Sequence, residues 1–91
     1  MNSGQFEDSA EILKALGHPV RLCIVSSLIE MENPCNVTTM QNCLNIPQST
    51  VSQHLAKLKS AGIIEGKRDG LEIRYYVVND RVRKIIKAFE D

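Results

Sequence analysis

The segment 47–60, PQSTVSQHLAKLKS, constrains the fold most, because it has helical spacing but an unusually narrow apolar face. At about 100° per residue, Val51, Leu55 and Leu58 fall within one arc, which must face the core. Solvent-facing helix surfaces normally carry Glu and Lys, which are stronger helix formers than Ser. Here the opposite side carries Ser49, Gln53, Ala56 and Ser60, flanked by Gln48 and Ser52. This pattern predicts a helix whose outer face approaches another surface closely.

Short polar side chains of this kind suit the major groove of DNA. Gln makes paired hydrogen bonds to adenine, and Ser donates to or accepts from several base edges. A shorter helix predicted from Thr38 or Thr39 to Leu44 and a turn at Asn45 precede the segment, which completes a helix-turn-helix. The alternative is a helix that packs on another subunit through its small residues. The predicted DNA contacts from this segment are Gln48, Ser49, Thr50, Ser52, Gln53, Lys57 and Lys59.

The pattern changes from helical to extended after Ala61-Gly62. Residues 63–64 and 73–78 are rich in β-branched and aromatic side chains, and Asp69-Gly70 between them is a signature of a tight hairpin turn. Lys67 and Arg68 near this turn can reach phosphates or the neighbouring minor groove, although a solvated turn is the alternative. A helix-turn-helix followed by such a hairpin is a winged helix.

Three further helices are predicted around this motif. The first runs from Asp8 or Ser9 to Gly17, the second from Pro19 to about Met31, and the last from a cap at Asn79 or Asp80. The fold class is therefore mainly α with a β-hairpin wing, in the order α-α-α-α-β-β-α. We expect one winged helix-turn-helix domain over residues 1–91, with a core small enough to benefit from a partner subunit.

Three stretches carry a resemblance to a known family: LKALGHPVRLCIVSSL (13–28), LNIPQSTVSQHLAKLKSAGII (44–64) and KRDGLEIRYYVV (67–78). They resemble the ArsR/SmtB family of winged helix-turn-helix transcriptional repressors, and most of all its non-metal, PagR-like branch. The resemblance implies a homodimer that binds double-stranded DNA at a palindromic promoter operator through the helix of residues 47–60. It also implies that the N- and C-terminal helices hold the dimer together. The dimer contacts would be Leu13, Leu16, Val82, Ile85, Ile86 and Phe89, with packing inside one subunit as the alternative for each.

The sequence predicts neither a metal site nor a cofactor. Metal-sensing members of the resembled family carry a Cys-x-Cys pair in the third helix or Asp, His and Glu ligands in the last, and neither set is present. His18 and His54 lie in unrelated helical contexts and are interpreted as structural. A thiol-based, redox-sensing repressor is the alternative to one without a ligand. Its candidate cysteines are Cys35 with Cys43, or Cys23, whose setting among apolar residues favours burial.

Composition excludes several other classes of protein. The net charge is zero, but residues 1–36 hold two basic against five acidic side chains, and residues 37–91 hold nine against six. No apolar run approaches a membrane span and the N-terminus is polar, so we expect a cytoplasmic protein with no membrane partner. Without a phosphate loop, acid-base pair or nucleophile motif, the chain is not expected to be an enzyme. A winged-helix protein-interaction module is a further alternative, in which the lysines near the DNA-facing helix have no role.

Overall fold

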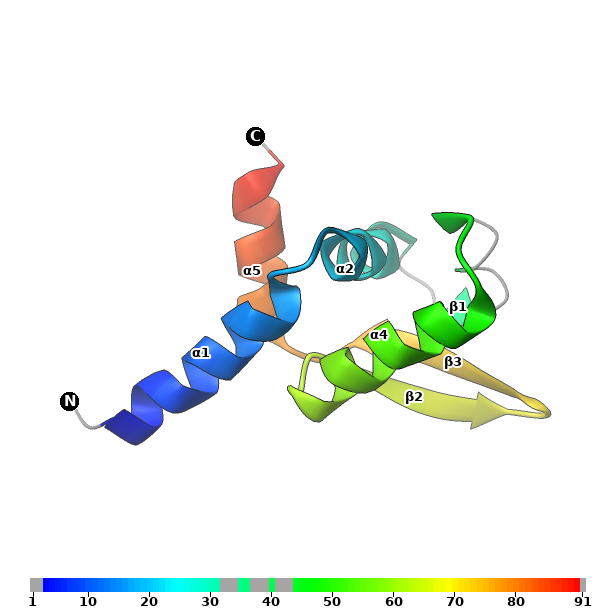
Figure 1. Cartoon of the computed structure of the whole chain (residues 1–91), viewed down its shortest axis with the longest axis horizontal. Helices are drawn as coiled ribbons and strands as arrows, with labels where there is room; N and C mark the ends of the chain where they lie inside the picture. The colour runs from blue at the N-terminus through cyan, green and yellow to red at the C-terminus, as the bar shows by residue number, and fades with distance from the viewer. Residues whose placement is uncertain (1–2, 32–34, 37–39, 41–43, 91) are drawn as a thin grey trace.

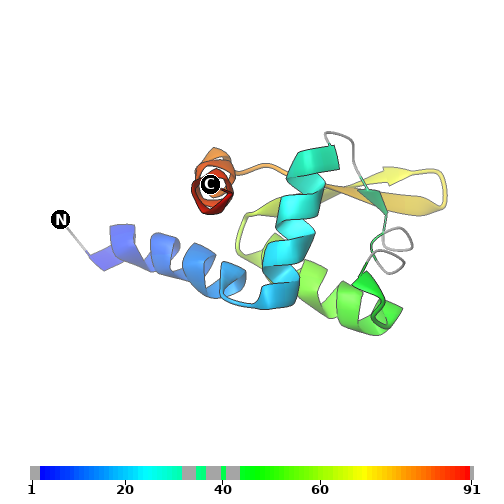
Figure 2. The same ribbon diagram turned by 90° about the horizontal axis from the view of Figure 1, so that it is seen from above.

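The computed structural model describes residues 3–31, 35–36, 40 and 44–90 of the 91-residue chain. Helices α2 and α4 form the centre of the molecule, and a hairpin of β2 and β3 extends from it (Figure 1). Helices α1 and α5 lie at the end opposite the hairpin tip (Figures 1 and 2). The elements are α1 (Ser3–Leu16), α2 (Pro19–Met31), β1 (Cys35–Asn36), α4 (Gln48–Ser60), β2 (Ile64–Asp69), β3 (Glu72–Val77) and α5 (Asp80–Phe89). This arrangement confirms the predicted winged helix-turn-helix.

The hydrophobic core lies where α2, α4, the base of the hairpin and α5 meet. The three apolar residues of the narrow arc on α4 are buried there as predicted. They join Ala15, Leu16, Ile24, Val25, Leu28, Met40, Ile63, Ile64, Val77, Val82 and Ile86. Burial of an aliphatic side chain of this size contributes about 1.5 to 3 kcal/mol, so the arc holds α4 firmly on the body.

The hairpin forms where the sequence predicted, but its turn lies one residue later than expected, at Gly70 and Leu71, since Asp69 still pairs with Glu72. Antiparallel pairing of β2 with β3 runs from Ile64 opposite Val77 to Asp69 opposite Glu72. Gly70 in the turn has a φ of 66°, a conformation that glycine adopts without steric cost. The short strand β1 adds to the other edge of β3, giving the order β1-β3-β2. We did not predict β1, because two residues are too few to show any periodicity.

The ends of the helices agree with the sequence in part. Asn79 caps α5 as predicted, since its side chain accepts hydrogen bonds from the N–H groups of Arg81 and Val82 at 3.0 and 3.3 Å. Helix α1 begins at Ser3, earlier than the predicted cap at Asp8 or Ser9. The sequence did not indicate this start, because the segment before Ser9 carries no apolar stripe, and its residues 4 and 6–8 are exposed.

The predicted third helix lies largely outside the described residues. Met40 and Leu44 are helical where the structure describes them, and Met40 is buried. Asn45 has a φ of 56°, the left-handed conformation expected of the residue that ends this helix.

Within the described ranges, no single helix is long and apolar enough to cross a membrane. Phe6–Leu16 and Pro19–Glu30 together meet that criterion of length and composition, but they are bent by 95° at the break between them.

Candidate nucleic-acid interface

Helix α4 presents the uncharged face that the sequence predicted. Val51, Leu55 and Leu58 are 0%, 2% and 0% exposed, so the opposite side of the helix must face outward. Thr50 differs from the other predicted contacts because it is half-buried. The exposed residues are Gln48, Ser49, Ser52, Gln53, Ala56, Lys57, Lys59 and Ser60. The face therefore combines short hydrogen-bonding groups with lysines toward its C-terminal end.

The N-terminus of α4 has no side-chain cap. Pro47 occupies the capping position, and its carbonyl accepts hydrogen bonds from the N–H groups of Thr50 and Val51 at 3.0 and 3.1 Å. The N–H groups that precede Thr50 at the start of the helix have no intrahelical acceptor and carry a partial positive charge. They suit a negatively charged group such as a phosphate.

The middle of α4 contacts the start of α2 through two histidines. The ring centroids of His18 and His54 lie 4.6 Å apart with a tilt of 52° between the ring planes. Nη1 of Arg21 lies 3.4 Å from Nδ1 of His54, and Nε of Arg21 donates to the carbonyl oxygen of Ala15. The prediction that these histidines have unrelated surroundings is therefore wrong, because the crossing of α2 and α4 brings them together.

This contact disfavours the charged form of His54. Burial lowers the pKa of His54 below its usual value of 6.5, and the positive charges of His18 and Arg21 lower it further. Nδ1 of His18 accepts a hydrogen bond from the N–H of Val20 at 3.1 Å, which requires that nitrogen to be unprotonated. The contact therefore favours a neutral imidazole at His54.

The hairpin tip carries cations that are free for a partner. Arg74 forms ion pairs with Asp69 at 3.1 Å and with Glu72 at 3.4 Å. Lys67 and Arg68 are exposed and form no ion pair with any residue that the structure describes. Sequence reasoning missed Arg74, whose role follows from its register opposite Lys67, beside both acids.

The hairpin requires a glycine at position 66. Gly66 lies opposite Tyr75, and a Cβ added to it would come within 2.7 Å of Cγ2 of Ile73 and 3.1 Å of Cε1 of Tyr75. The side chains of β3 thus fold over the bare backbone of β2, an arrangement in which aromatic residues cover glycine in sheets. This packing fixes the shape of the hairpin that carries Lys67 and Arg68.

The exposed face of α4 and the hairpin tip are placed to act together. The N-terminal end of α4 and the tip of β2 and β3 point toward the same end of the molecule in both views (Figures 1 and 2). One ligand of sufficient length can therefore contact both. A DNA duplex has this length, with a major groove for the helix and phosphates for the tip.

The predicted dimer contacts separate into two groups. Leu16, Val82 and Ile86 are only 4%, 0% and 4% exposed inside one chain, so for them the alternative, packing within one subunit, is correct. Their side chains already fill the core and leave no surface for a partner. Leu13 and Phe89 are 57% and 77% exposed, and Ile85 is half-buried. Phe6, which sequence reasoning missed, is also exposed on α1.

The cysteines differ from the expectation in one respect. Cys23 is a free, exposed thiol, because α2 turns Ile24, Val25 and Leu28 toward the core and Cys23 away from it. Cys43 lies outside the described residues, and the structure describes Cys35 only by its backbone in β1. Among the residues described, no group of three or more His, Cys, Asp or Glu side chains is placed to hold a metal ion. The absence of a metal site in this protein stays a prediction.

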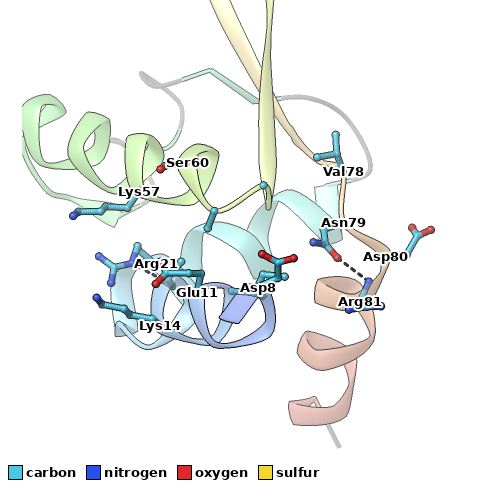
Figure 3. Close-up of a pocket in the computed structure, with 14 residues that line it drawn as sticks. Asp8, Glu11, Lys14, Arg21, Lys57, Ser60, Val78, Asn79, Asp80 and Arg81 are labelled. Atoms are coloured by element: carbon cyan, nitrogen blue, oxygen red, sulfur yellow. Dashed lines mark hydrogen bonds between the residues drawn. The ribbon is translucent and has the colours of Figure 1, made fainter. Parts of the chain in front are cut away.

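A cleft of about 760 Å³ lies between α1, the C-terminal end of α4 and the start of α5. Figure 3 shows Lys14, Arg21 and Lys57 on one side of it. On the other side, the side chain of Asn79 accepts a hydrogen bond from the N–H of Arg81. Acidic residues line it as well, including Asp8, Glu11 and Asp80. Its mixed charges do not select one class of small molecule.

Comparison with known proteins gives consistent matches over this region. The model of the family described as "Bacterial regulatory protein, arsR family" matches residues 18–66. An uncharacterised HTH-type transcriptional regulator of Methanocaldococcus jannaschii is 42% identical over 87 residues, which cover 96% of this chain and 97% of that protein. The transcriptional repressor PagR of Bacillus anthracis is 47% identical over 81 residues, which cover 89% of this chain and 80% of PagR.

Solved structures show the same similarity. The crystal structure of PagR matches with a TM-score of 0.88 and 43% identity, over 98% of this chain and 100% of that one. The homodimeric winged helix-turn-helix DNA-binding domain of a possible ArsR-family transcriptional regulator from Mycobacterium bovis matches with a TM-score of 0.85. It is 24% identical, covers 97% of this chain and 80% of that chain, and supports the fold alone.

Proposed function

Because this chain belongs to the arsR family of bacterial regulatory proteins, which are DNA-binding transcription regulators rather than enzymes, we propose that it is a homodimeric repressor. It binds a palindromic promoter operator in the cytoplasm and uses no metal. The observation that supports this most is the position of the N-terminal end of α4, which carries exposed uncharged side chains and points toward the same end of the molecule as the cationic hairpin tip.

In this proposal the exposed polar residues of α4 contact bases. Gln48, Ser49, Ser52 and Gln53 lie in its first two turns, the part of a recognition helix that contacts base edges. Thr50 lies among them but is half-buried, so it contributes less to DNA contact than they do. Lys57, Lys59, Lys67 and Arg68 contact phosphates, together with the uncapped N–H groups at the start of α4.

The dimer forms through α1 and α5. Both helices lie away from the hairpin tip, and each exposes a large apolar side chain that a monomer leaves in water, Leu13 on α1 and Phe89 on α5. Phe6 and the half-buried Ile85 extend the same two helices. Two-fold symmetry would place two copies of α4 in successive major grooves, about 34 Å apart.

Selection of bound genomic DNA by the purified protein tests the proposal. We expect enrichment of a sequence with two-fold symmetry, and sedimentation of the free protein as a dimer. Affinity for that sequence should fall on the order of a thousandfold or more between about 50 and 200 mM salt, as expected for six to eight phosphate contacts. Failure to enrich any sequence, with binding that does not depend on salt, would instead indicate a protein-interaction module.

A thiol-sensing repressor is a second candidate, favoured by the exposed thiol of Cys23. Oxidation at this position would add a polar group to a helix that packs on α4, β3 and α5. Operator affinity measured for fully reduced and for oxidised protein in one buffer distinguishes the two candidates. Equal affinities would end the thiol hypothesis, and a difference that disappears in C23S would assign it to this residue.

A further inference from the structure

The tip of the hairpin exposes an apolar side chain among cations. Leu71, next to Gly70 in the turn, is 102% exposed, and Ile73 at the start of β3 is 44% exposed. Single exposed apolar residues are common on proteins, so exposure alone has no meaning. Leu71, however, lies in the turn at the tip of the hairpin, which extends away from the core (Figure 1), and Lys67 and Arg68 lie close to this turn in β2.

Charge pairing makes this tip suitable for a polyanion. Asp69 and Glu72 flank the turn and would repel phosphates if they were free. Arg74 holds both of them in ion pairs, at 3.1 and 3.4 Å. The cations Lys67 and Arg68 have no such partner among the described residues. The tip therefore offers unpaired positive charge from β2 close to an apolar turn residue.

The register of the hairpin places one cation next to the apolar group. Arg68 lies opposite Ile73, and directly paired residues of antiparallel strands share a face. This face continues inward to Ile64 and Val77, which are buried in the core. Arg68, Ile73 and the adjoining turn thus form a small surface that is cationic and apolar together.

We propose that Leu71 enters the minor groove of the operator as an apolar wedge, with Arg68 on the adjoining phosphates, and so bends the DNA. The inference rests on the proposed function, because it assumes that α4 occupies the neighbouring major groove. Proteins that insert apolar side chains between base steps of the minor groove kink the duplex and gain contact surface in return. A leucine on a two-residue turn has the size and reach for such an insertion, and the unpaired cations hold it against the backbone.

The test measures DNA bending by full-length protein on a short duplex that carries the sequence enriched by the wild type. L71A removes the wedge, and L71M keeps a side chain of similar size. V78A is the matched control, since it shortens another exposed apolar side chain, 41% exposed, at the base of the hairpin. We expect L71A to reduce the bend and weaken binding on the order of tenfold, while L71M and V78A bend the duplex as the wild type does.

Salt dependence separates the wedge from a charge effect. L71A should leave the slope of affinity against salt unchanged, because it removes no cation, whereas R68A should reduce the slope by about one phosphate contact. The Leu71 side chain is wholly exposed, so L71A should also melt at the wild-type temperature. A change in either the salt slope or the melting temperature of L71A would contradict the wedge.

Two further outcomes would overturn the inference. If replacement of thymine by uracil in the duplex reproduces the loss caused by L71A, then Leu71 contacts a thymine methyl group in the major groove. If L71A binds and bends the enriched duplex as the wild type does, Leu71 has no role, although the proposed function stands. A wild type that enriches no DNA would remove the proposed function, and the wedge with it.

Discussion

The imidazole rings of His18 and His54 lie 4.6 Å apart and connect the N-terminus of α2 to the middle of α4. His18 accepts a hydrogen bond from the N–H of Val20, and Arg21 approaches His54 from the side at 3.4 Å. A positive charge on His54 would lie close to the guanidinium group of Arg21. The packing of α4 on the start of α2 therefore favours a neutral ring at His54.

This contact predicts a loss of stability in mild acid. The folded protein lowers the pKa of His54 below 6.5, its ordinary value in the unfolded chain. Stability is therefore complete above pH 6.5 and falls as the pH decreases from 6.5 through the lowered pKa, since the unfolded chain binds the proton first. Urea denaturation from pH 8 to pH 5 measures the effect. His54→Gln should flatten this part of the profile, and an unchanged slope in that variant would assign the acid sensitivity to other groups.

Replacement of the proposed base contacts should change the preference of the protein for particular DNA sequences. Ser52→Ala or Gln53→Ala should each cost roughly 1 to 3 kcal/mol of operator binding and relax the preference at one base pair. Lys67→Ala should weaken binding to all sequences alike and reduce the salt slope by about one. Titration of the operator and of single-base variants distinguishes these results. If all three variants lose affinity uniformly across sequences, α4 is not the recognition helix.

Loss of the ion pairs at the hairpin tip should weaken DNA binding while the protein stays folded. Arg74→Ala would free Asp69 and Glu72, whose charges would then repel the phosphates, at a cost of roughly 0.5 to 1 kcal/mol in low salt. The unfolding free energy should change by less than about 1 kcal/mol, because both ion pairs are exposed. D69N and E72Q added to the variant should restore the affinity. Failure of this rescue would show that Arg74 contacts DNA itself.

Two substitutions on α5 should separate folding of the subunit from assembly of the dimer. Val82→Ala creates a cavity in the core and should cost about 2 kcal/mol of unfolding free energy at every protein concentration. Phe89→Ala should raise the dimer dissociation constant while the fold of the subunit is retained, because Phe89 is 77% exposed. Sedimentation and urea denaturation over a range of concentrations separate the two. A Phe89→Ala protein that dimerises as the wild type does would place the interface elsewhere.

Features that depend on a few neighbouring residues were predictable from the sequence. The buried arc of Val51, Leu55 and Leu58 follows from helical geometry, and a hairpin turn at Gly70 follows, to within one residue, from the backbone preference of glycine. The cap at Asn79 follows from the need of the first helical N–H groups for an acceptor. Because this information is local, the winged helix and the outward face of α4 were already determined by the sequence alone.

Tertiary structure decided which groups from distant parts of the chain meet. The crossing of α2 and α4 brings His18 against His54, and the register of the hairpin sets Arg74 between two acids. The same holds for the terminal helices, where Val82 is buried in its own chain and Phe89 remains exposed. An amphipathic pattern shows that a residue is buried. Whether it is buried by its own chain or by a partner subunit depends on how the helices pack. That choice depends on distances in space, which periodicity along a sequence does not contain.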